Sequence, residues 1–442
     1  MKPDRLFVRA LARCFLAGEP EPAQIVARSA RMMGREWRWL QPLARRYIKN
    51  FNGQTLPRER DVVQFFLRDA PFRRAWTKHS HELTVEQWLT DPQRMRPVAA
   101  AREWNVPAIE SPMALAKWLD VDADRLRWFA DLKGIAHEQD RPHLSHYHYR
   151  VLTKQFGSIR LIEVPKPRLK EMQRKILWEI LERIPPHPAV HGFCKGRSIR
   201  TFVAPHIGKD VVLRMDLRDF FPTFRAARIQ AFFRTLGYPE AVADLLGGIC
   251  TNATPSEAWK NIGIDVDLGR LGEALRLYAR PHLPQGTPTS PALANLCSYR
   301  IDSRLNGLAQ SVGAVYTRYA DDLAFSGDSQ FARRIERFST HLAAILMEEG
   351  FSVHHRKTRV MRQSVRQHLA GLVLNQHANV VRADFDRLKA TLTNCARFGP
   401  ASQNREEHTH FCAHLQGKVS FVEMVNPEKA KRLRAIFEQI SW

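Results

Sequence analysis

Two adjacent carboxylates, Asp321 and Asp322, lie in a Tyr-Ala-Asp-Asp turn between two runs of β-prone residues, 315–319 and 323–326. Adjacent carboxylates repel each other and lose hydration in a folded protein. A divalent cation, which prefers hard oxygen ligands, is the usual reason to keep them together. A third carboxylate, Asp216, stands at the end of an alternating apolar run upstream. Three carboxylates on neighbouring strands predict a two-metal site for phosphoryl transfer.

The three carboxylates are expected to have unequal roles at this site. Asp216 and Asp321 are predicted to bridge two Mg²⁺ ions, with Mn²⁺ as an alternative. Asp322 is a weaker or indirect ligand, because neighbouring residues on a strand point to opposite faces. Two such ions, roughly 4 Å apart, activate a 3′-hydroxyl and neutralise a pyrophosphate leaving group. A single aspartate in a turn is usually a capping residue, but the three together favour a nucleic-acid polymerase.

The composition is typical of a protein that binds a polyanion. The chain has 442 residues and a formal net charge of +23, which favours nucleic acid as a partner; a well-solvated basic surface is the alternative. Its six cysteines are scattered without a close pair, which predicts a reducing cytoplasm rather than a disulfide framework or a zinc site. No run of about 18 apolar residues occurs, so no membrane partner is expected.

The pattern of short strands and helices predicts an α+β fold in three parts. Residues 1–133 have apolar side chains at helical spacing and form an N-terminal helical extension, and a polar linker is expected at 134–143. Residues 134–375 mix strand-like and helical runs, and residues 376–442 return to basic helical sequence. Strands are expected at 159–164, 210–216, 315–319 and 323–326, and helices at 168–184, 225–236, 291–310 and 330–349.

From about residue 145 to 440 the chain resembles the reverse transcriptases. Besides the aspartate motifs, residues 282–295 are similar to that family's Leu-Pro-Gln-Gly segment. The resemblance implies that Gln285 contacts the nucleotide or template and that Gly286 lets the backbone approach a base or sugar. Phe221 matches the family's steric gate, a ring that excludes the ribose 2′-hydroxyl. The implied architecture is a right-hand polymerase, with residues 134–375 as fingers and palm and 376–442 as the thumb.

Basic residues complete the predicted nucleotide site. Residues 157–168 resemble the family's fingers segment, in which Arg160 would grip the triphosphate because a guanidinium binds phosphate bidentately. Lys166 and Arg168 are expected to contact the triphosphate or the template RNA. Lys357 matches the position of a lysine near the leaving pyrophosphate, where it would act as a general acid. An ordinary surface lysine is an equally good interpretation of Lys166 and of Lys357.

Several stretches resemble the retron branch of bacterial reverse transcriptases. Residues 191–199 are similar to a His-Gly-Phe stretch of that branch, and His206 matches the histidine of its Asn-Ala-x-x-His motif. Phe202 and Val203 replace the asparagine and alanine of that motif, and residues 369–371 keep only the glycine of a Val-Thr-Gly motif. These departures leave open whether the product is the branched RNA–DNA of retrons. RNA contacts are implied for His206 and, on the C-terminal helix, for Lys429, Lys431 and Arg432.

The resemblance implies an RNA-directed DNA polymerase that copies a structured noncoding RNA, with dNTPs as substrates and an RNA–DNA product. A role in a retron or another anti-phage defence system, with an effector protein as a further partner, is implied in the same way. One alternative is a template-independent or protein-primed DNA synthesis enzyme of the abortive-infection type. Another is an RNA-binding scaffold with a silent catalytic site.

Overall fold

The computed structural model describes residues 3–51, 57–89, 93–135, 145–153, 159–260 and 268–442. The predicted linker at 134–143 and the start of the fingers segment at 157–158 therefore lie largely outside the described residues. The chain forms two compact units, of which the first contains residues 1–185 and 221–293 and the second 186–220 and 294–442. The three aspartates belong to the second unit, whereas Phe221 and the Leu-Pro-Gln-Gly segment belong to the first.

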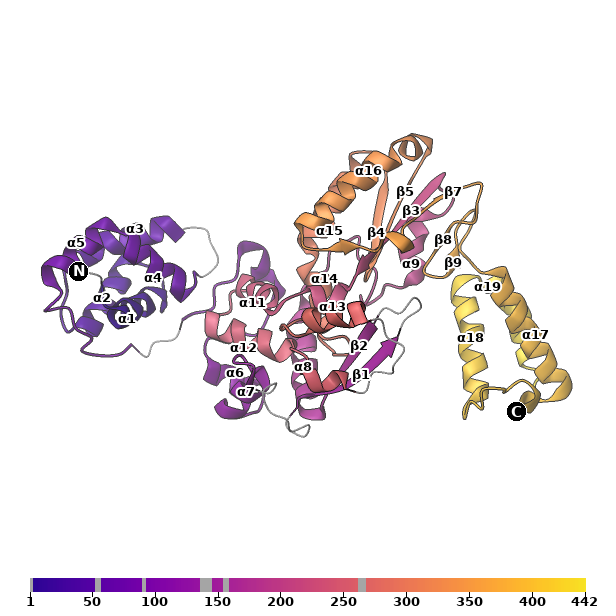
Figure 1. The fold of residues 1–442 in the computed structure, drawn as a ribbon, viewed down its shortest axis with the longest axis horizontal. Helices are drawn as coiled ribbons and strands as arrows, with labels where there is room; N and C mark the ends of the chain where they lie inside the picture. The colour runs from indigo at the N-terminus through magenta and orange to yellow at the C-terminus, as the bar shows by residue number, and fades with distance from the viewer. Residues whose placement is uncertain (1–2, 52–56, 90–92, 136–144, 154–158, 261–267) are drawn as a thin grey trace. The chain divides into compact units, whose positions relative to one another are not determined.

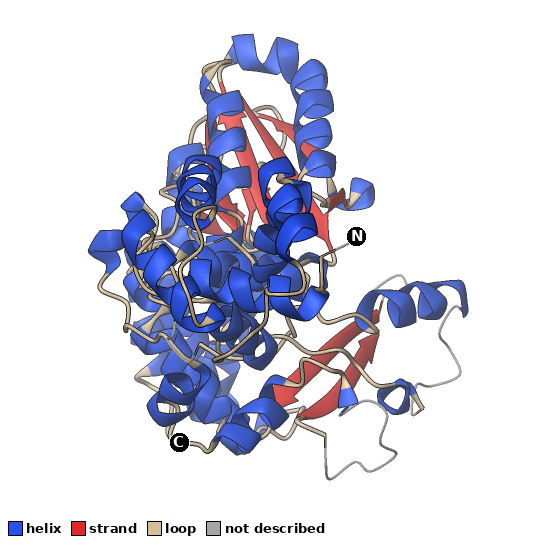
Figure 2. Ribbon diagram, turned by 90° about the vertical axis from the view of Figure 1, so that its left-hand side faces the viewer, coloured by secondary structure: helices blue, strands red, loops and turns tan. Residues whose placement is uncertain are grey.

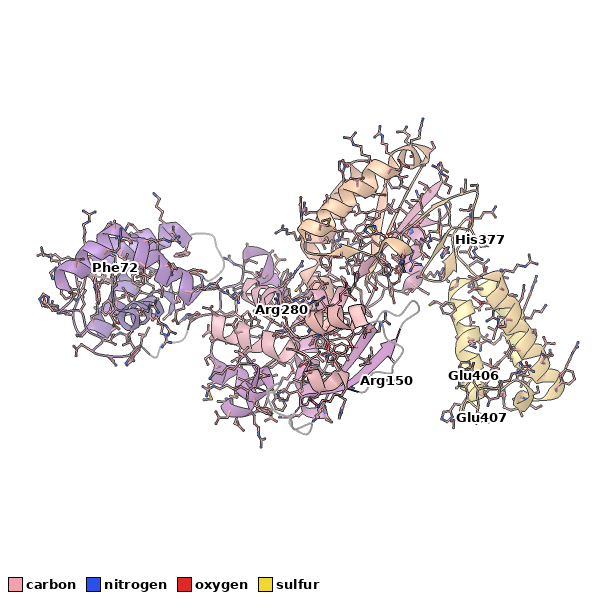
Figure 3. All side chains as sticks on the ribbon, viewed as in Figure 1. Phe72, Arg150, Arg280, His377, Glu406 and Glu407 are labelled. Atoms are coloured by element: carbon pink, nitrogen blue, oxygen red, sulfur yellow. The ribbon has the colours of Figure 1, made fainter. Side chains whose placement is uncertain are left out.

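The first unit begins with five helices that share one hydrophobic core (Figure 1). Asp4 caps the first helix, since its side chain accepts hydrogen bonds from the backbone N–H groups of Leu6 and Phe7. Phe15 packs against Tyr47 and Phe66 with ring centroids 5.2 and 4.9 Å apart. Phe72 belongs to the same core (Figure 3). The helices are α1 (Arg5–Leu16), α2 (Pro22–Met33), α3 (Leu40–Phe51), α4 (Glu59–Arg68) and α5 (Ala70–His79).

The helices that follow, α6 (Pro112–Trp118) and α7 (Ala123–Ala130), pack on α12 (Glu240–Cys250) instead of on the first five helices. Gly248 of α12 permits this contact, because a Cβ there would lie 2.2 Å from the Ala130 carbonyl oxygen. The core of the first five helices includes residues up to Leu83, with Leu89 packed against it, and helical structure continues to Ala130, so the boundary at residue 133 stays a prediction. Apolar periodicity shows that a segment is helical but does not show which neighbour covers its apolar face.

The rest of the first unit holds an antiparallel hairpin with helices beside it. Strands β1 (Tyr147–Thr153), which carries Arg150 (Figure 3), and β2 (Ile159–Pro165) pair along their length. Leu161 packs in a small core with Trp259 and Tyr278. The helices are η1 (Ala99–Trp104), α8 (Pro167–Glu179), η4 (Leu181–Arg183), α11 (Ala226–Thr235), η6 (Ser256–Trp259) and α13 (Leu268–Tyr278), with α10 (Phe220–Thr223) and α14 (Ser290–Cys297) at the boundaries of the unit.

The second unit is built on an antiparallel sheet, whose strands are drawn in red in Figure 2. The strand order is β4-β5-β3-β6, and β7 also pairs with β3. Phe325 packs on Phe338 of helix α16 on one side of the sheet. Phe202 and Val212 share a core on the other side, because successive residues of a strand face opposite ways. The elements are α9 (Ile199–Val203), η5 (Ala204–His206), β3 (Val211–Arg218), α15 (Tyr299–Gln310), β4 (Val315–Tyr319), β5 (Asp322–Gly327), α16 (Ser329–Glu348), β6 (Ser352–Val353), η7 (His355–Lys357) and β7 (Arg359–Arg362).

The C-terminal helices share the core on the Phe202 side of this sheet. Leu392, Leu415 and Leu433 belong to the same hydrophobic cluster as Phe202. The C-terminal elements are β8 (His368–Leu369), β9 (Leu372–Val373), β10 (Asn379–Val380), α17 (Arg382–Phe398), η8 (Pro400–Ser402), α18 (Phe411–Val425) and α19 (Pro427–Phe437). The predicted strands and the helices at 225–236 and 330–349 are confirmed to within a few residues, and the fold is α+β. The predicted helix at 168–184 is divided into α8 and η4, and that at 291–310 into α14 and α15. None of the described helices has the length and apolar character needed to cross a membrane.

Candidate active site

The register of the sheet brings the predicted carboxylates together at one end of β3. Asp216 is the Cα partner of Asp322 across the β3–β5 pair, and the backbone N–H of Leu217 donates to the Asp321 carbonyl at 2.9 Å. Asp216 is only 4% exposed. Ala320 and Asp321 connect β4 to β5, and Ala320 has a φ of 54°, a left-handed conformation that a tight hairpin connection often requires. The turn therefore presents Asp321 next to the end of the central strand.

Arg214 neutralises one of the three carboxylates. Its guanidinium donates to both Asp322 carboxylate oxygens, at 2.8–3.1 Å. Arg214 is the register partner of Ala324, so it lies diagonal to Asp322 on the same face of the sheet. Burial raises the pKa of Asp322, and Arg214 opposes that increase. Sequence reasoning missed Arg214, although its position two residues before Asp216 already places both side chains on one face of a strand.

Lys357 contacts another of the carboxylates. Its Nζ lies 2.9 and 3.0 Å from the two carboxylate oxygens of Asp216. The segment is held in place by the backbone, because the N–H of His354 donates to the Asp216 carbonyl at 2.8 Å. The Lys357 side chain remains about half exposed, so it can reach a ligand in solvent as well as Asp216.

Asp321 lies close to two other carboxylates, those of Asp216 and Asp322. Burial raises its pKa, and the neighbouring carboxylates of Asp216 and Asp322 raise it further. A buried carboxylate whose ionised form is disfavoured gains most from a cation. The donor chemistry of Asp216 and Asp321 therefore fits a divalent metal ion.

The set of three carboxylate ligands stays a prediction. Among the described residues, no group of three or more acidic, histidine or cysteine side chains is arranged to hold a metal ion. Asp216 is paired with Lys357, and Asp322 is paired with Arg214 because the strand register places that guanidinium within its reach. Asp216 and Asp321 are the main candidate oxygen donors, and Asp322 is the weaker one.

A buried ion pair supports the catalytic turn from behind. Arg318 and Asp302 are 1% and 0% exposed and are joined by two hydrogen bonds of 2.7 Å. Arg318 also donates to the Ala320 carbonyl and to the Asn295 side-chain oxygen, both at 3.1 Å. The hydroxyl of Tyr316 donates to Asp302 at 2.8 Å. The network thus fixes the backbone next to Asp321, and sequence reasoning did not identify it.

His206 does not occupy the RNA-binding position that was predicted for it. It is fully buried, and its ring nitrogens lie 2.7 Å from the hydroxyls of Ser326 and Thr317. Thr317 donates its proton to the Phe202 carbonyl, so it accepts from Nε2–H of His206, and Nδ1 accepts from Ser326. Burial lowers the pKa of His206 to about 3, so the ring is neutral at physiological pH. His206 therefore joins η5 to β4 and β5, and direct RNA contact is excluded by its burial.

The predicted nucleotide-binding residues of the first unit gather between β2 and the Leu-Pro-Gln-Gly segment. The backbone N–H of Glu163 donates to the Gln285 carbonyl at 2.8 Å. Gly286 approaches so closely that a Cβ would lie 3.1 Å from the Glu163 carbonyl oxygen, and its φ is 122°. Arg160 lies on the same strand as Glu163, and its Nε is buried without a hydrogen-bond partner in the described part of the chain. Lys166 follows directly as the N-cap residue of α8.

A buried polar cluster fastens these two segments to each other. The Glu163 side chain lies 3.0 Å from Nε2 of His282 and accepts from Asn252 and Thr254 at 2.8 and 2.9 Å. Glu163 and His282 are both fully buried. Residue types alone did not identify this cluster, because its members are up to 119 residues apart in the chain.

Two further predicted contact residues are Phe221 and Arg168. Phe221 is the first residue of the 221–293 segment of the first unit. Its neighbour Phe220 belongs to the second unit, where its ring stacks on Phe351. Arg168 is exposed and forms weak surface pairs with Asp120 and Glu171.

The three predicted RNA-binding residues of the thumb lie on α19. Lys431 and Arg432 are exposed, and Lys431 pairs with Glu428 at 2.8 Å. Lys429 lies over the ring of Phe385, 5.3 Å from its centroid, and is less exposed. Two of the three charges are therefore presented to solvent, where they can meet phosphate groups.

Comparisons with known proteins show the family to which this chain belongs. Residues 152–374 match the family model described as reverse transcriptase (RNA-dependent DNA polymerase). The Retron Mx65 and Mx162 reverse transcriptases of Myxococcus xanthus are 40% and 36% identical to this chain, over 68% and 76% of it and 66% and 68% of their own lengths. The Retron Ec86 reverse transcriptase of Escherichia coli is 30% identical over 65% of this chain and 79% of its own length. The chain thus spans about two thirds of the two Myxococcus relatives.

Proposed function

Because this chain belongs to the reverse transcriptase family of RNA-dependent DNA polymerases, we propose that it copies a structured noncoding RNA into DNA at Asp216 and Asp321. The observation that carries this proposal is the β3–β5 register, which places Asp216 opposite the Tyr-Ala-Asp-Asp turn. The intact acidic pair speaks against a silent RNA-binding scaffold, because a scaffold has no need for a buried Asp321 whose pKa is raised by burial and by neighbouring carboxylates.

Asp216 and Asp321 are the residues that would hold two Mg²⁺ ions, or Mn²⁺, in this proposal. Bound there, the ions would lower the pKa of the attacking 3′-hydroxyl and stabilise charge on the leaving pyrophosphate. Lys357 donates to Asp216 in the metal-free protein, and its half-exposed ammonium is available as a general acid for the pyrophosphate. Arg214 keeps Asp322 paired and thereby fixes the start of β5.

The first unit supplies the substrate contacts of the proposed reaction. Arg160 and Lys166 would bind the triphosphate of the dNTP, since Arg160 holds a buried nitrogen without a partner in the described residues. Gln285 and Gly286 would contact the nucleotide or template, and the close approach of Gly286 to the Glu163 carbonyl fixes this segment beside β2. Phe221 would contact the sugar.

The RNA partner is proposed to bind through phosphate contacts. The exposed charges of Lys431 and Arg432, with Lys429 and Arg168 as weaker contributors, would bind an RNA stem, and this binding should weaken as salt increases. We propose a cytoplasmic location, which the six free thiols support. A defence role with an effector partner and an RNA–DNA product are also part of the proposal.

A primer-extension assay on an RNA template tests the proposed function. Purified protein is given a primed RNA of defined sequence, the four dNTPs and Mg²⁺, and the products are sequenced. We expect DNA complementary to the template, no synthesis after chelation of the metal, and none when the template is omitted. Synthesis without a template would favour the abortive-infection alternative, and an absence of any synthesis with or without RNA would favour the scaffold. Sequencing of copurified nucleic acid would show whether the natural product is branched.

Substitution of Phe221 tests the sugar gate. Phe221→Ala is expected to raise the preference for ribonucleotides by about 10- to 100-fold, the range over which a pocket discriminates small groups by shape. The measurement is the ratio of kcat/KM for an rNTP to that for the matching dNTP. Phe221→Tyr keeps the ring and should leave the ratio near that of the wild type. An unchanged ratio in Phe221→Ala would remove the gate assignment.

A further inference from the structure

Phe193 combines two features that rarely occur together in a folded protein. It is 52% exposed, although its ring is large and apolar. Its φ is 58°, a left-handed backbone conformation that bulky residues seldom adopt. Strained, non-glycine positions of this kind concentrate at functional sites. Core packing does not explain a half-exposed ring, so the strain points to a binding role.

The loop that carries Phe193 is held by hydrogen bonds on both sides of it. Arg197 donates to the Pro188 carbonyl at 2.8 Å and also to the Val190 carbonyl. Asn295 donates to the Gly192 carbonyl at 2.8 Å, and the N–H of Arg197 donates to the Cys194 carbonyl at 3.1 Å. These bonds fix the backbone before and after Phe193, so little backbone freedom is lost when the ring binds a ligand.

The same loop lies against the catalytic turn. A Cβ on Gly192 would lie 2.7 Å from the backbone nitrogen of Ala320, and the N–H of His191 donates to the Arg318 carbonyl at 2.7 Å. The Phe193 ring centroid is 6.2 Å from that of Tyr319, the first residue of the Tyr-Ala-Asp-Asp turn. The exposed ring thus lies within the second unit beside the turn that holds Asp321.

We propose that Phe193 is a stacking platform for a base of the DNA strand that is being extended. This inference rests on the proposed function. The 3′ end of that strand must reach Asp216 and Asp321, and Phe193 lies beside their turn. Exposed Lys195 and Arg200 on the same segment add cationic charge for the strand's phosphates. In proteins that bind single-stranded nucleic acid, exposed aromatic rings among basic residues stack on the flat faces of unpaired or terminal bases.

A series of primers with single abasic sites tests the proposal. Each primer lacks one base within the last few positions and is annealed to the same RNA, and its affinity for the protein is measured by fluorescence anisotropy. The wild type should lose about 10- to 100-fold in affinity at one or two primer positions, the effect typical of one lost base stack. Phe193→Ala should bind the intact primer with the reduced affinity that the wild type shows for the primer whose abasic site weakens binding most. Its affinity should not decrease further when that base is missing. Phe193→Trp should keep the wild-type profile.

Two further variants separate binding from folding. Phe193→Gly removes the ring and also relieves the left-handed strain, so its unfolding midpoint should not decrease while its primer affinity decreases. Phe398→Ala, which removes another exposed phenylalanine of the second unit, should keep the abasic profile of the wild type.

The outcomes distinguish this inference from the proposed function. If the wild type neither binds nor extends primed RNA, the proposed function fails. If the wild type extends primers but Phe193→Ala shows the same abasic profile, the stacking proposal alone is overturned. Sensitivity confined to abasic sites in the template would overturn the assignment to the extended strand, and a stability loss in Phe193→Gly without a change in affinity would show a structural role.

Discussion

Asp321→Asn is expected to reduce DNA synthesis by at least about 1000-fold while raising the stability of the metal-free protein. Metal-bound carboxylates supply several kcal/mol of transition-state stabilisation, and each 1.36 kcal/mol corresponds to a tenfold change in rate. The amide of asparagine keeps the shape of the side chain and one oxygen but loses the charge that holds the cation. The measurement is the rate of single-nucleotide incorporation on primed RNA.

The stability change follows from the raised pKa of Asp321. Burial, with the carboxylates of Asp216 and Asp322, raises this pKa above the ordinary value of about 3.9. Folding therefore disfavours the ionised side chain, and the folded protein loses stability as the pH increases from about 3.9 through the raised pKa. Asparagine cannot ionise, so the variant should have the higher Tm at neutral pH, and the two Tm values should converge at low pH. Mg²⁺ should raise the Tm of the wild type more than that of Asp321→Asn.

Asp386→Asn is the matched control for this prediction. Asp386 is an exposed carboxylate on α17, and its substitution should change neither the incorporation rate nor the response of the Tm to Mg²⁺. If Asp321→Asn retained more than about a tenth of the wild-type rate, the assignment of Asp321 as a metal-holding residue would be wrong.

Arg318→Met is expected to lower the free energy of unfolding by about 3–5 kcal/mol, the usual cost of removing one partner of a buried ion pair. The change leaves the fully buried carboxylate of Asp302 without the guanidinium that neutralises it. It also removes the hydrogen bond to the Ala320 carbonyl, so DNA synthesis should decrease as the turn loses its support. Equilibrium unfolding in urea gives the stability, and the incorporation rate at a temperature well below the transition gives the activity.

A double-mutant cycle identifies the origin of that loss. Adding Asp302→Asn removes the uncompensated charge and should restore part of the stability. The sum of the losses of unfolding free energy in the two single variants should therefore exceed the loss in the double variant.

Arg127→Met is the control at an exposed ion pair. It removes an arginine that pairs with Asp124, and the two side chains are 74% and 94% exposed. This change should lower the free energy of unfolding by less than about 1 kcal/mol. A cost below about 1 kcal/mol for Arg318→Met as well would show that the buried network does not stabilise the fold.

The chain's local patterns allowed much of the fold and the acidic centre to be predicted. The strands around Asp216 and the Tyr-Ala-Asp-Asp turn were predicted because alternation of apolar residues and tight-turn residues are properties of short segments. The packing partners of the helices were harder to predict. Helical periodicity shows that α6 and α7 have apolar faces, but only the folded chain shows that α12 covers them.

The family, the α+β class and the candidate acidic residues could be predicted from the sequence, because each prediction depends on residues close together in the chain. The partners of the acidic residues could be found only in the folded protein. It pairs Asp322 with Arg214 across 108 residues and buries His206 against strands more than 100 residues away. Such pairings depend on strand register and burial, which are set by the cooperative packing of the whole unit and not by any short segment.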